Sequence, residues 1–278
     1  MRGGAWGETA RAGRTRLPFR AFGGAVLLAL LWFQGCAVAI FPPSVPGKPY
    51  VRLFGRAGGT AVWIVDGPYV REHLDEEFTN FGQHYGFRFI PKDEFWLDDQ
   101  NAPGEEPFFV AHLLVERRLM AGGLDYDPAL DEADKAEQAI RDATPLARVG
   151  KALLAAGRRG ELIARIHKQL LPEYGDRVKV WIVDGELVRD VFFIDFTEGG
   201  HGRVYPFVPA GEVWLDDDVA PAEREFILLH ELHERALMAG GWSYAKAHRD
   251  SSRIEYHYRR HPAGLDAALR AEMAKNRS

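Results

Sequence analysis

Cysteine is almost missing from this 278-residue sequence, in which Cys36 is the only one. A single cysteine cannot form a disulfide within the chain, so the fold must be stable without one. The shortage also excludes the cysteine-rich zinc sites of small structural domains. Any zinc site in this protein must therefore use His and carboxylate side chains.

An excess of positive charge is missing as well. The chain has 35 Lys and Arg against 40 Asp and Glu, which gives a formal net charge of -5. Without a basic stripe to neutralise phosphates, no nucleic acid partner is expected. The 46% of hydrophobic residues is enough to give two domains of ordinary size a buried core each.

The amino terminus has the pattern of an export or membrane segment. Residues 1–20 contain five arginines and one acidic residue, and the run 21–41 that follows is uncharged. Such a run is about long enough to cross a bilayer as a helix, and the arginines would keep its amino end in the cytoplasm. We therefore expect contact with the membrane through residues 21–41 and the bulk of the chain outside the cytoplasm. If this leader does not function, the protein is cytoplasmic.

Three fates of this segment are compatible with the residues: an uncleaved anchor, a signal peptide cut after the triplet at 37–39, and a lipoprotein modified at Cys36. The first two are favoured, because Phe33 and Gln34 fit a lipidation motif poorly. The proline-rich stretch 42–49 cannot form a helix or a central strand, so it predicts a spacer.

The rest of the chain contains the same unit twice. A shift of 118 positions aligns Val62–Gly67 with Val180–Gly185, and 32 of the 65 pairs up to Tyr126 and Tyr244 are identical. This similarity indicates a duplication with a shared fold. We divide the chain into an export signal or anchor with its spacer (1–47), a first repeat (48–142), a helical linker (143–177) and a second repeat (178–278).

Each repeat predicts a small sheet followed by two helices. In the second repeat, strands are expected at 178–184, 191–196, 204–208 and 212–215, in an antiparallel meander. A helix should begin near Pro221 and end at Gly240–Gly241, where glycine suits a left-handed cap, and a second should run from Ser243 to about Arg260. The segment 146–171 should be a helix joining the repeats. The expected fold class is α+β: a tandem duplication of a small antiparallel sheet followed by a helix pair, with an N-terminal hydrophobic helix.

The first of these helices carries the candidate chemistry. His230 and Glu234 are four residues apart, so they project side by side, and both fall within an apolar stripe. His112 and Glu116 repeat the pattern in the first copy. An ionised carboxylate buried without a partner costs several kcal/mol, and a bound metal ion would compensate both side chains.

The segment His230-Glu231-Leu232-His233-Glu234 resembles the active-site helix of the zincin metallopeptidases, whose motif is His-Glu-x-x-His. Glu234 stands where that motif has its second His. The resemblance implies a metal-dependent hydrolase, with a divalent metal such as Zn²⁺, a peptide or protein substrate and Glu231 as the general base. A third ligand from the following helix is also implied; His248 is the leading candidate and Glu255 the alternative. His233 is a further alternative, although it points to the other side of the helix.

The first repeat lacks part of this set. It has Leu113, Val115 and Leu130 where the second repeat has Glu231, His233 and His248. We therefore expect the first copy to be degenerate, with His112 and Glu116 holding a structural ion or forming a hydrogen-bonded pair.

Two functions follow from these patterns. The first is an exported or membrane-anchored metal-dependent hydrolase, peptidase-like, with its site in the second repeat. The alternative is a non-enzymatic two-domain structural or binding protein in which both His/Glu pairs are buried structural pairs. The acidic runs Trp96–Asp99 and Trp214–Asp217 are expected to cap helices, with calcium binding as a lesser option, and His257 and His261 to be solvated.

Overall fold

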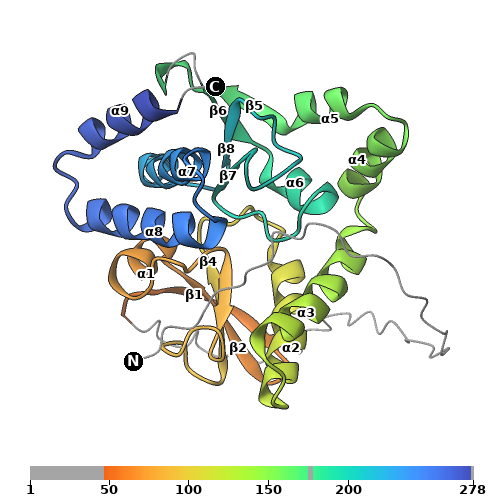
Figure 1. The fold of residues 1–278 in the computed structure, drawn as a ribbon. Helices are drawn as coiled ribbons and strands as arrows, with labels where there is room; N and C mark the ends of the chain where they lie inside the picture. Colours follow the sequence, from red (N-terminus) through yellow and green to blue (C-terminus); the bar gives the residue numbers. More distant parts are fainter. Residues whose placement is uncertain (1–46, 175–177, 277–278) are drawn as a thin grey trace. The chain divides into compact units, whose positions relative to one another are not determined.

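Two four-stranded sheets, one from each repeat, form the framework of the protein (Figure 1). The computed structural model describes residues 47–174 and 178–276. The hydrophobic segment 21–41, with Cys36 and the cleavage triplet, lies outside the described residues. Among the helices that the structure describes, none is both long enough and apolar enough to span a bilayer.

The two sheets have the same strand order. The first contains β1 (Tyr50–Ala57), β2 (Thr60–Val65), β4 (Glu94–Asp98) and β3 (Phe81–Gln83), in that spatial order. The second contains β5 (His167–Leu170), β6 (Lys179–Val183), β8 (Glu212–Asp216) and β7 (Gly199–His201). In each sheet the central pair is parallel and both outer strands are antiparallel to their neighbours. The α+β class with two duplicated sheets is confirmed, whereas the antiparallel meander is wrong.

The error arises at the Asp-Gly that ends the first predicted strand. Asp184 does not begin a hairpin turn but caps a short helix, α6 (Gly185–Val191), by accepting a hydrogen bond from the Leu187 amide. The first repeat has the equivalent helix α1 (Gly67–His73). Because the chain crosses over through this helix, the next central strand returns parallel to the first. The predicted strands at 191–196 and 204–208 are correspondingly wrong, since these segments form the end of α6, turns and loops.

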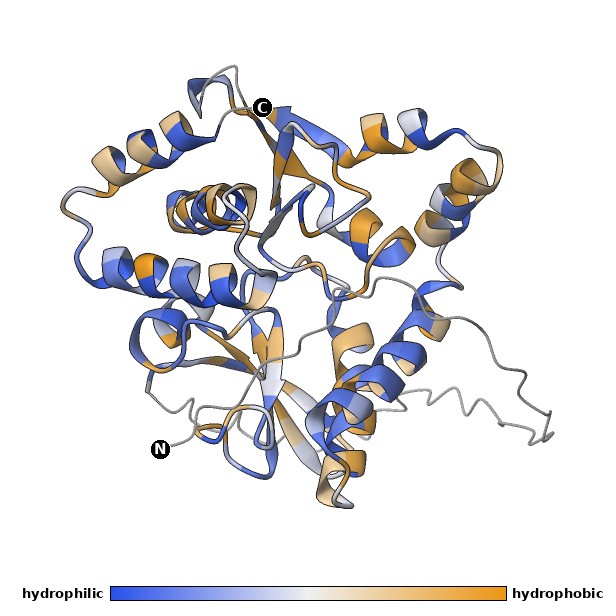
Figure 2. Cartoon of the chain, viewed as in Figure 1, coloured by the Kyte–Doolittle hydropathy of each residue, from blue (hydrophilic) through white to orange (hydrophobic). Residues whose placement is uncertain are grey.

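The helix pairs that follow each sheet are confirmed. They are α2 (Glu106–Ala121) with α3 (Tyr126–Arg141), and α7 (Arg224–Ala239) with α8 (Tyr244–Arg260). Gly241 has a φ of 91° and so supplies the left-handed residue expected after α7. Hydrophilic residues cover most of α3 and α8 (Figure 2). Helix α8 nevertheless packs Ile254 and Tyr258 against the hydrophobic core of the second repeat.

The segment between the repeats is only partly a helix. It forms α4 (Pro145–Ala155) and α5 (Arg159–Ile166), separated at Gly157, whose φ is 70°. The chain then enters β5 and a 3-10 turn at Pro172–Tyr174, so the end of the predicted linker belongs to the second sheet. A last helix, α9 (Leu265–Lys275), follows α8 and packs against α7.

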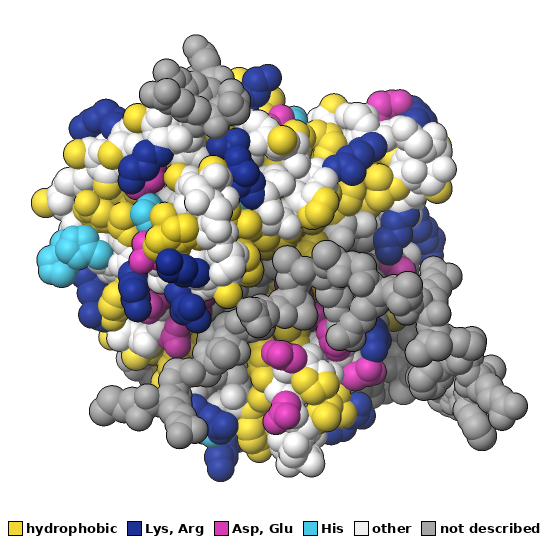
Figure 3. Space-filling view, viewed as in Figure 1, with side chains coloured by type: hydrophobic (Ala, Val, Ile, Leu, Met, Phe, Trp, Pro, Cys, Tyr) yellow, Lys and Arg dark blue, Asp and Glu magenta, His cyan; other side chains and the backbone are white. Residues whose placement is uncertain are grey.

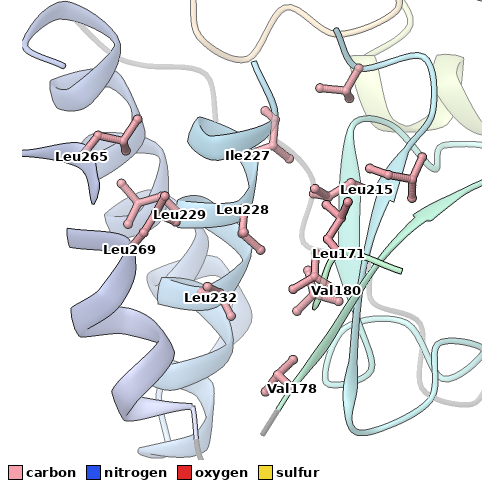
Figure 4. Close-up of a cluster of buried hydrophobic side chains, with 13 residues drawn as sticks. Leu171, Val178, Val180, Leu215, Ile227, Leu228, Leu229, Leu232, Leu265 and Leu269 are labelled. Carbon is pink, nitrogen blue, oxygen red and sulfur yellow. The ribbon is translucent and has the colours of Figure 1, made fainter. Parts of the chain in front are cut away.

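Each sheet has a hydrophobic core on both faces, because alternate strand residues point to opposite sides. On one face of the second sheet, Val180 and Leu215 pack against Leu228 and Leu232 of α7, with Leu269 of α9 behind them (Figure 4). The opposite face is covered by α4, α5 and α6. This packing fixes α7 against the second sheet, with α8 beside it.

Reciprocal ion pairs join the two repeats. Arg71 of the first repeat binds Asp98 of its own repeat and lies 3.4 Å from Glu223 of the second. Its equivalent, Arg189, binds Asp216 of the second repeat and lies 2.7 Å from Glu105 of the first. All of these side chains are buried. Each repeat thus supplies an arginine and a carboxylate to the other.

Candidate metal centre

Helix α7 brings His230 and Glu234 to one surface, as their spacing predicts. Both side chains are buried, and the neighbouring helix α8 contributes His248 beside them. Close packing of α7 on α8 follows from their short connection through Gly240–Gly241. The structure thus brings together the three residues expected to bind a metal.

Three donor atoms of this group face one another. His230 Nε2 lies 3.1 Å from His248 Nδ1, which lies 3.0 Å from Glu234 Oε2. The third separation, from His230 Nε2 to Glu234 Oε2, is 3.8 Å. Ligands about 2.0–2.2 Å from a tetrahedral zinc ion are about 3.3–3.6 Å apart. Two of the three separations are shorter than this range and one is longer, so small shifts of the side chains would bring the donor atoms to three corners of such a site.

The second ring nitrogen of His230 has its own partner. Nδ1 lies 2.8 Å from Oε2 of Glu255, whose other oxygen binds Arg259. A carboxylate behind a ligating imidazole fixes the ring and leaves the opposite nitrogen free to bind a metal. Glu255, which sequence alone offered as an alternative ligand, therefore lies behind His230 rather than in the group of three.

Partner carboxylates control the charges of these side chains. Burial opposes protonation of His230, but the nearby carboxylates of Glu234 and Glu255 outweigh it and raise its pKa well above the usual value. Burial likewise opposes protonation of His248, and Glu234 and Glu77 raise its pKa to about 9. A shared carboxylate, Glu234, thus favours protons on these imidazoles. A divalent cation would replace those protons with a single central charge.

Glu231 follows His230 on α7 and lies close to Glu234. Burial, and then the charge of Glu234, raises the pKa of Glu231 to about 8. A glycine makes room for this side chain: a Cβ atom on Gly199 would come within 3.2 Å of Glu231 Cγ. The first repeat has Phe81 at the position of Gly199, and its ring packs against His112. The space beside the histidine is therefore occupied by a carboxyl group in the second repeat and by an aromatic ring in the first repeat.

His201 of β7 is a site residue that the sequence reasoning missed. Its Nε2 lies 3.1 Å from Glu234 Oε1, although the approach is not aligned as a hydrogen bond. Burial lowers its pKa. The available signal was the comparison of repeats, because the first copy has Gln83 at this position and that amide donates to Glu116.

His201, Glu231 and Glu234 form a second group with the dimensions of a metal site. The tautomer of His201 argues against metal binding by this second group. Its Nδ1 accepts a hydrogen bond from the Arg203 amide, so Nε2 must carry the proton of the neutral ring. A protonated nitrogen cannot bind a metal, whereas His230 and His248 present the required nitrogens to Glu234.

His233 takes part in a different interaction. Its ring nitrogens lie 3.0 Å from Glu272 of α9 and 3.1 Å from Asp250 of α8. These contacts tie three helices together and account for both nitrogens. The structure does not bring His233 into the group of three donors.

The first repeat keeps the histidine and carboxylate without the rest. His112 Nε2 lies 3.2 Å from Glu116, and Nδ1 lies 3.0 Å from Glu137. Both ring nitrogens are occupied by carboxylates, and Leu130 stands where the second repeat has His248. This arrangement is a buried ionic pair, one of the two alternatives expected for the first copy.

The acidic runs cap helices, but not those that follow them. Asp217 Oδ1 accepts a hydrogen bond from the Gly185 amide at the start of α6, and Asp99 does the same for Gly67 of α1. Asp216, Asp217 and Asp218 also group closely enough to hold a cation, but the guanidinium of Arg189 binds two of these three carboxylates.

Outside the site, His257 and His261 are exposed and stack on each other, as expected. On the face drawn in Figure 3, basic side chains lie at several separate places. Comparison of the chain with protein-family models, curated proteins and solved structures found no match.

Proposed function

We propose that this protein is a metal-dependent hydrolase whose site lies in the second repeat, with zinc as the expected metal and peptide bonds as the expected substrate. One observation carries the proposal: the donor atoms of His230, Glu234 and His248 lie 3.0, 3.1 and 3.8 Å from one another, close enough to bind one ion together. Three protein ligands leave a fourth position for water, which is the arrangement of catalytic zinc sites.

The roles of the side chains follow from their positions. His230 Nε2, His248 Nδ1 and Glu234 Oε2 hold the ion, and Glu255 orients His230. A metal lowers the pKa of its bound water to about 7, and a nearby carboxylate can take the proton as that water attacks a carbonyl carbon. Glu231 is the base in this scheme, because it lies beside Glu234 without belonging to the group of three.

The location of the protein is part of the same proposal. Residues 21–41 have the length and composition of an export signal or anchor, with the arginines on their amino side. The hydrolase would then act outside the cytoplasm, either tethered to the membrane or released from it.

Metal content tests the proposal first. Plasma mass spectrometry of the purified protein should find about one equivalent of zinc or a similar ion. His230→Ala should lose it, whereas His112→Ala, the matched change in the first repeat, should keep it. Absence of metal in the wild-type protein after zinc is supplied would contradict the proposal.

Activity tests the role of Glu231. Glu231→Gln should keep the metal and lose hydrolysis of a peptide mixture, followed by mass spectrometry, by about 100-fold or more. If the variant retains full activity, Glu231 is not the base.

The second candidate is a non-enzymatic binding or structural protein, and the first repeat is the observation that favours it. There the same His/Glu pair is stabilised by ion pairs alone. In that case, both His230→Ala and His112→Ala should destabilise the protein, and neither repeat should bind metal.

A further inference from the structure

A loop of the first repeat reaches the candidate metal centre of the second. Glu77, which follows α1, lies with its Oε2 atom 3.4 Å from Nε2 of His248 on α8. Ser252, one turn further along α8, donates its hydroxyl to the His248 carbonyl.

The position of Glu77 matters because of which nitrogen His248 directs to the centre. Nδ1 faces Glu234 and His230, so Nδ1 must lose its proton to bind a metal, and Nε2 must then carry one. The Glu77 carboxylate, 3.4 Å from Nε2, is an acceptor for that N–H group. It stands to His248 as Glu255 stands to His230, which gives each histidine a carboxylate behind it.

The first repeat offers a natural comparison, because the exchange of loops is reciprocal. Asp195, the equivalent of Glu77, extends from the second repeat toward the cluster of the first, where it interacts with His112 and Asp134. That cluster has Leu130 in place of His248. Each repeat therefore extends one carboxylate toward the cluster of the other repeat. Only Glu77 contacts a histidine whose second ring nitrogen faces a group of metal donors.

We propose that Glu77 is a positioning residue of the metal centre, so that the active site is assembled from both repeats although all of its ligands come from one. This inference rests on the proposed function. It gives the first repeat a part in the chemistry: the repeat has no metal site of its own among the described residues, yet it orients a ligand in the other.

Zinc affinity of the full chain, measured by competition with a chromophoric chelator, tests this role. Glu77→Gln should bind zinc about 10- to 100-fold more weakly, which is the usual effect of removing a carboxylate behind a ligating histidine. Asp195→Asn, the matched change, should leave the affinity within about twofold of wild type, because it touches no ligand. Glu77→Asp should recover part of the loss, since it restores the negative charge.

A second readout separates positioning from stability. The visible spectrum of the cobalt-loaded protein reports the ligand geometry, and it should change in Glu77→Gln but not in Asp195→Asn. The side chains of Glu77 and His248 are each 31% exposed, so the fold should tolerate the substitution. If Glu77→Gln does not fold, Glu77→Ala carries the same expectations.

The outcomes distinguish this inference from the proposed function. If wild type binds zinc and Glu77→Gln matches it in affinity and cobalt spectrum, the positioning role is overturned and the hydrolase proposal stands. If wild type binds neither zinc nor cobalt, the metal centre itself is overturned. Equal weakening by Glu77→Gln and Asp195→Asn would assign the effect to contact between the repeats and would also overturn the positioning role.

Discussion

His112 and His230 occupy equivalent positions, yet their surroundings differ on one side of the ring. Each directs Nδ1 to a glutamate of the next helix. The Nε2 atom of His112 meets Glu116, whereas that of His230 meets another imidazole. Two carboxylates stabilise a fully protonated ring, whereas two imidazole nitrogens that face each other have room for only one proton, or one cation, between them. The same residue therefore forms an ion pair in one repeat and a candidate ligand in the other.

The ion pair predicts a pH-dependent stability. Burial opposes protonation of His112, but Glu116 and Glu137 raise its pKa from 6.5 to about 10. Its contribution to the free energy of unfolding should be complete below about pH 6.5 and should decline as the pH rises to about 10. Removing a partner of a buried ion pair costs about 3–5 kcal/mol, so His112→Ala should lose about that much at pH 6 and less at pH 9. Urea denaturation at both pH values measures this; an equal loss at both would contradict it.

A glycine next to the site gives a second prediction. A Cβ atom on Gly199 would lie 3.0 Å from Ile227 and 3.2 Å from Glu231. Gly199→Ala should therefore cost about 1–3 kcal/mol and reduce hydrolysis, because the Glu231 carboxylate is displaced, while the metal is retained. Gly211, where a Cβ would meet nothing within 4 Å, provides the control Gly211→Ala. Undiminished activity in Gly199→Ala would show that Glu231 does not need this space.

At the scale of elements, the sequence predicted long segments better than short ones. Helix α7 was predicted from an apolar stripe that persists over several turns, and α8 from the residues at its ends, beginning at Ser243. Helix α6 was missed because its seven residues contain fewer than two complete repeats of the helical period, and its Asp-Gly start also fits a hairpin turn. The parallel central pair could not be predicted once this helix was taken for a strand.

The residues of the candidate site likewise fall into those that the sequence could predict and those that it could not. His230, Glu234 and His248 could be chosen from one helix and its neighbour, because short connections place neighbouring helices side by side. The predicted ligand set remains a prediction, and the structure brings its members together. His201 and Glu77 come from another strand and another repeat, so only the sheet order and the contact between repeats place them there.

The short helix that redirects the chain depends on its N-cap. Asp184 accepts a hydrogen bond from the Leu187 amide at 2.9 Å. Asp184→Ala should lower the free energy of unfolding by about 0.5–2 kcal/mol, as N-cap losses usually do, and Asp184→Asn should recover most of it. Chemical denaturation provides the measurement. A loss from Asn as large as that from Ala would assign the effect to the negative charge instead of the cap.

At the scale of the whole molecule, two chains of buried ion pairs run between the repeats. One passes from Arg71 through Glu223, Arg259 and Glu255 to His230. The other begins at Arg189 and passes through Glu105, Arg141 and Glu137 to His112. The two series of ion pairs consist of the same residue types, but only the first series ends at the candidate metal centre.

This difference predicts that matched substitutions will separate stability from metal binding. Arg71→Met and Arg189→Met should each cost about 3–5 kcal/mol, because each leaves buried carboxylates without their partner. Only Arg71→Met should also weaken zinc binding, through looser placement of Glu255 behind His230. Denaturation and chelator competition on the same samples would test this. Equal zinc affinities in the two variants would mean that the loss of Arg71 does not disturb the placement of His230.

The reciprocal pairs have a consequence for the history of the chain. The arginine of each repeat contacts the equivalent glutamate of the other repeat. Such a reciprocal contact is isologous, as in a two-fold homodimer. A single ancestral repeat with both the arginine and the glutamate would have carried both sides of its own dimer interface. Fusing two such genes keeps that interface but frees the halves from having the same sequence. One half could then have leucine and valine where the other has glutamate and histidine, which no true homodimer can do.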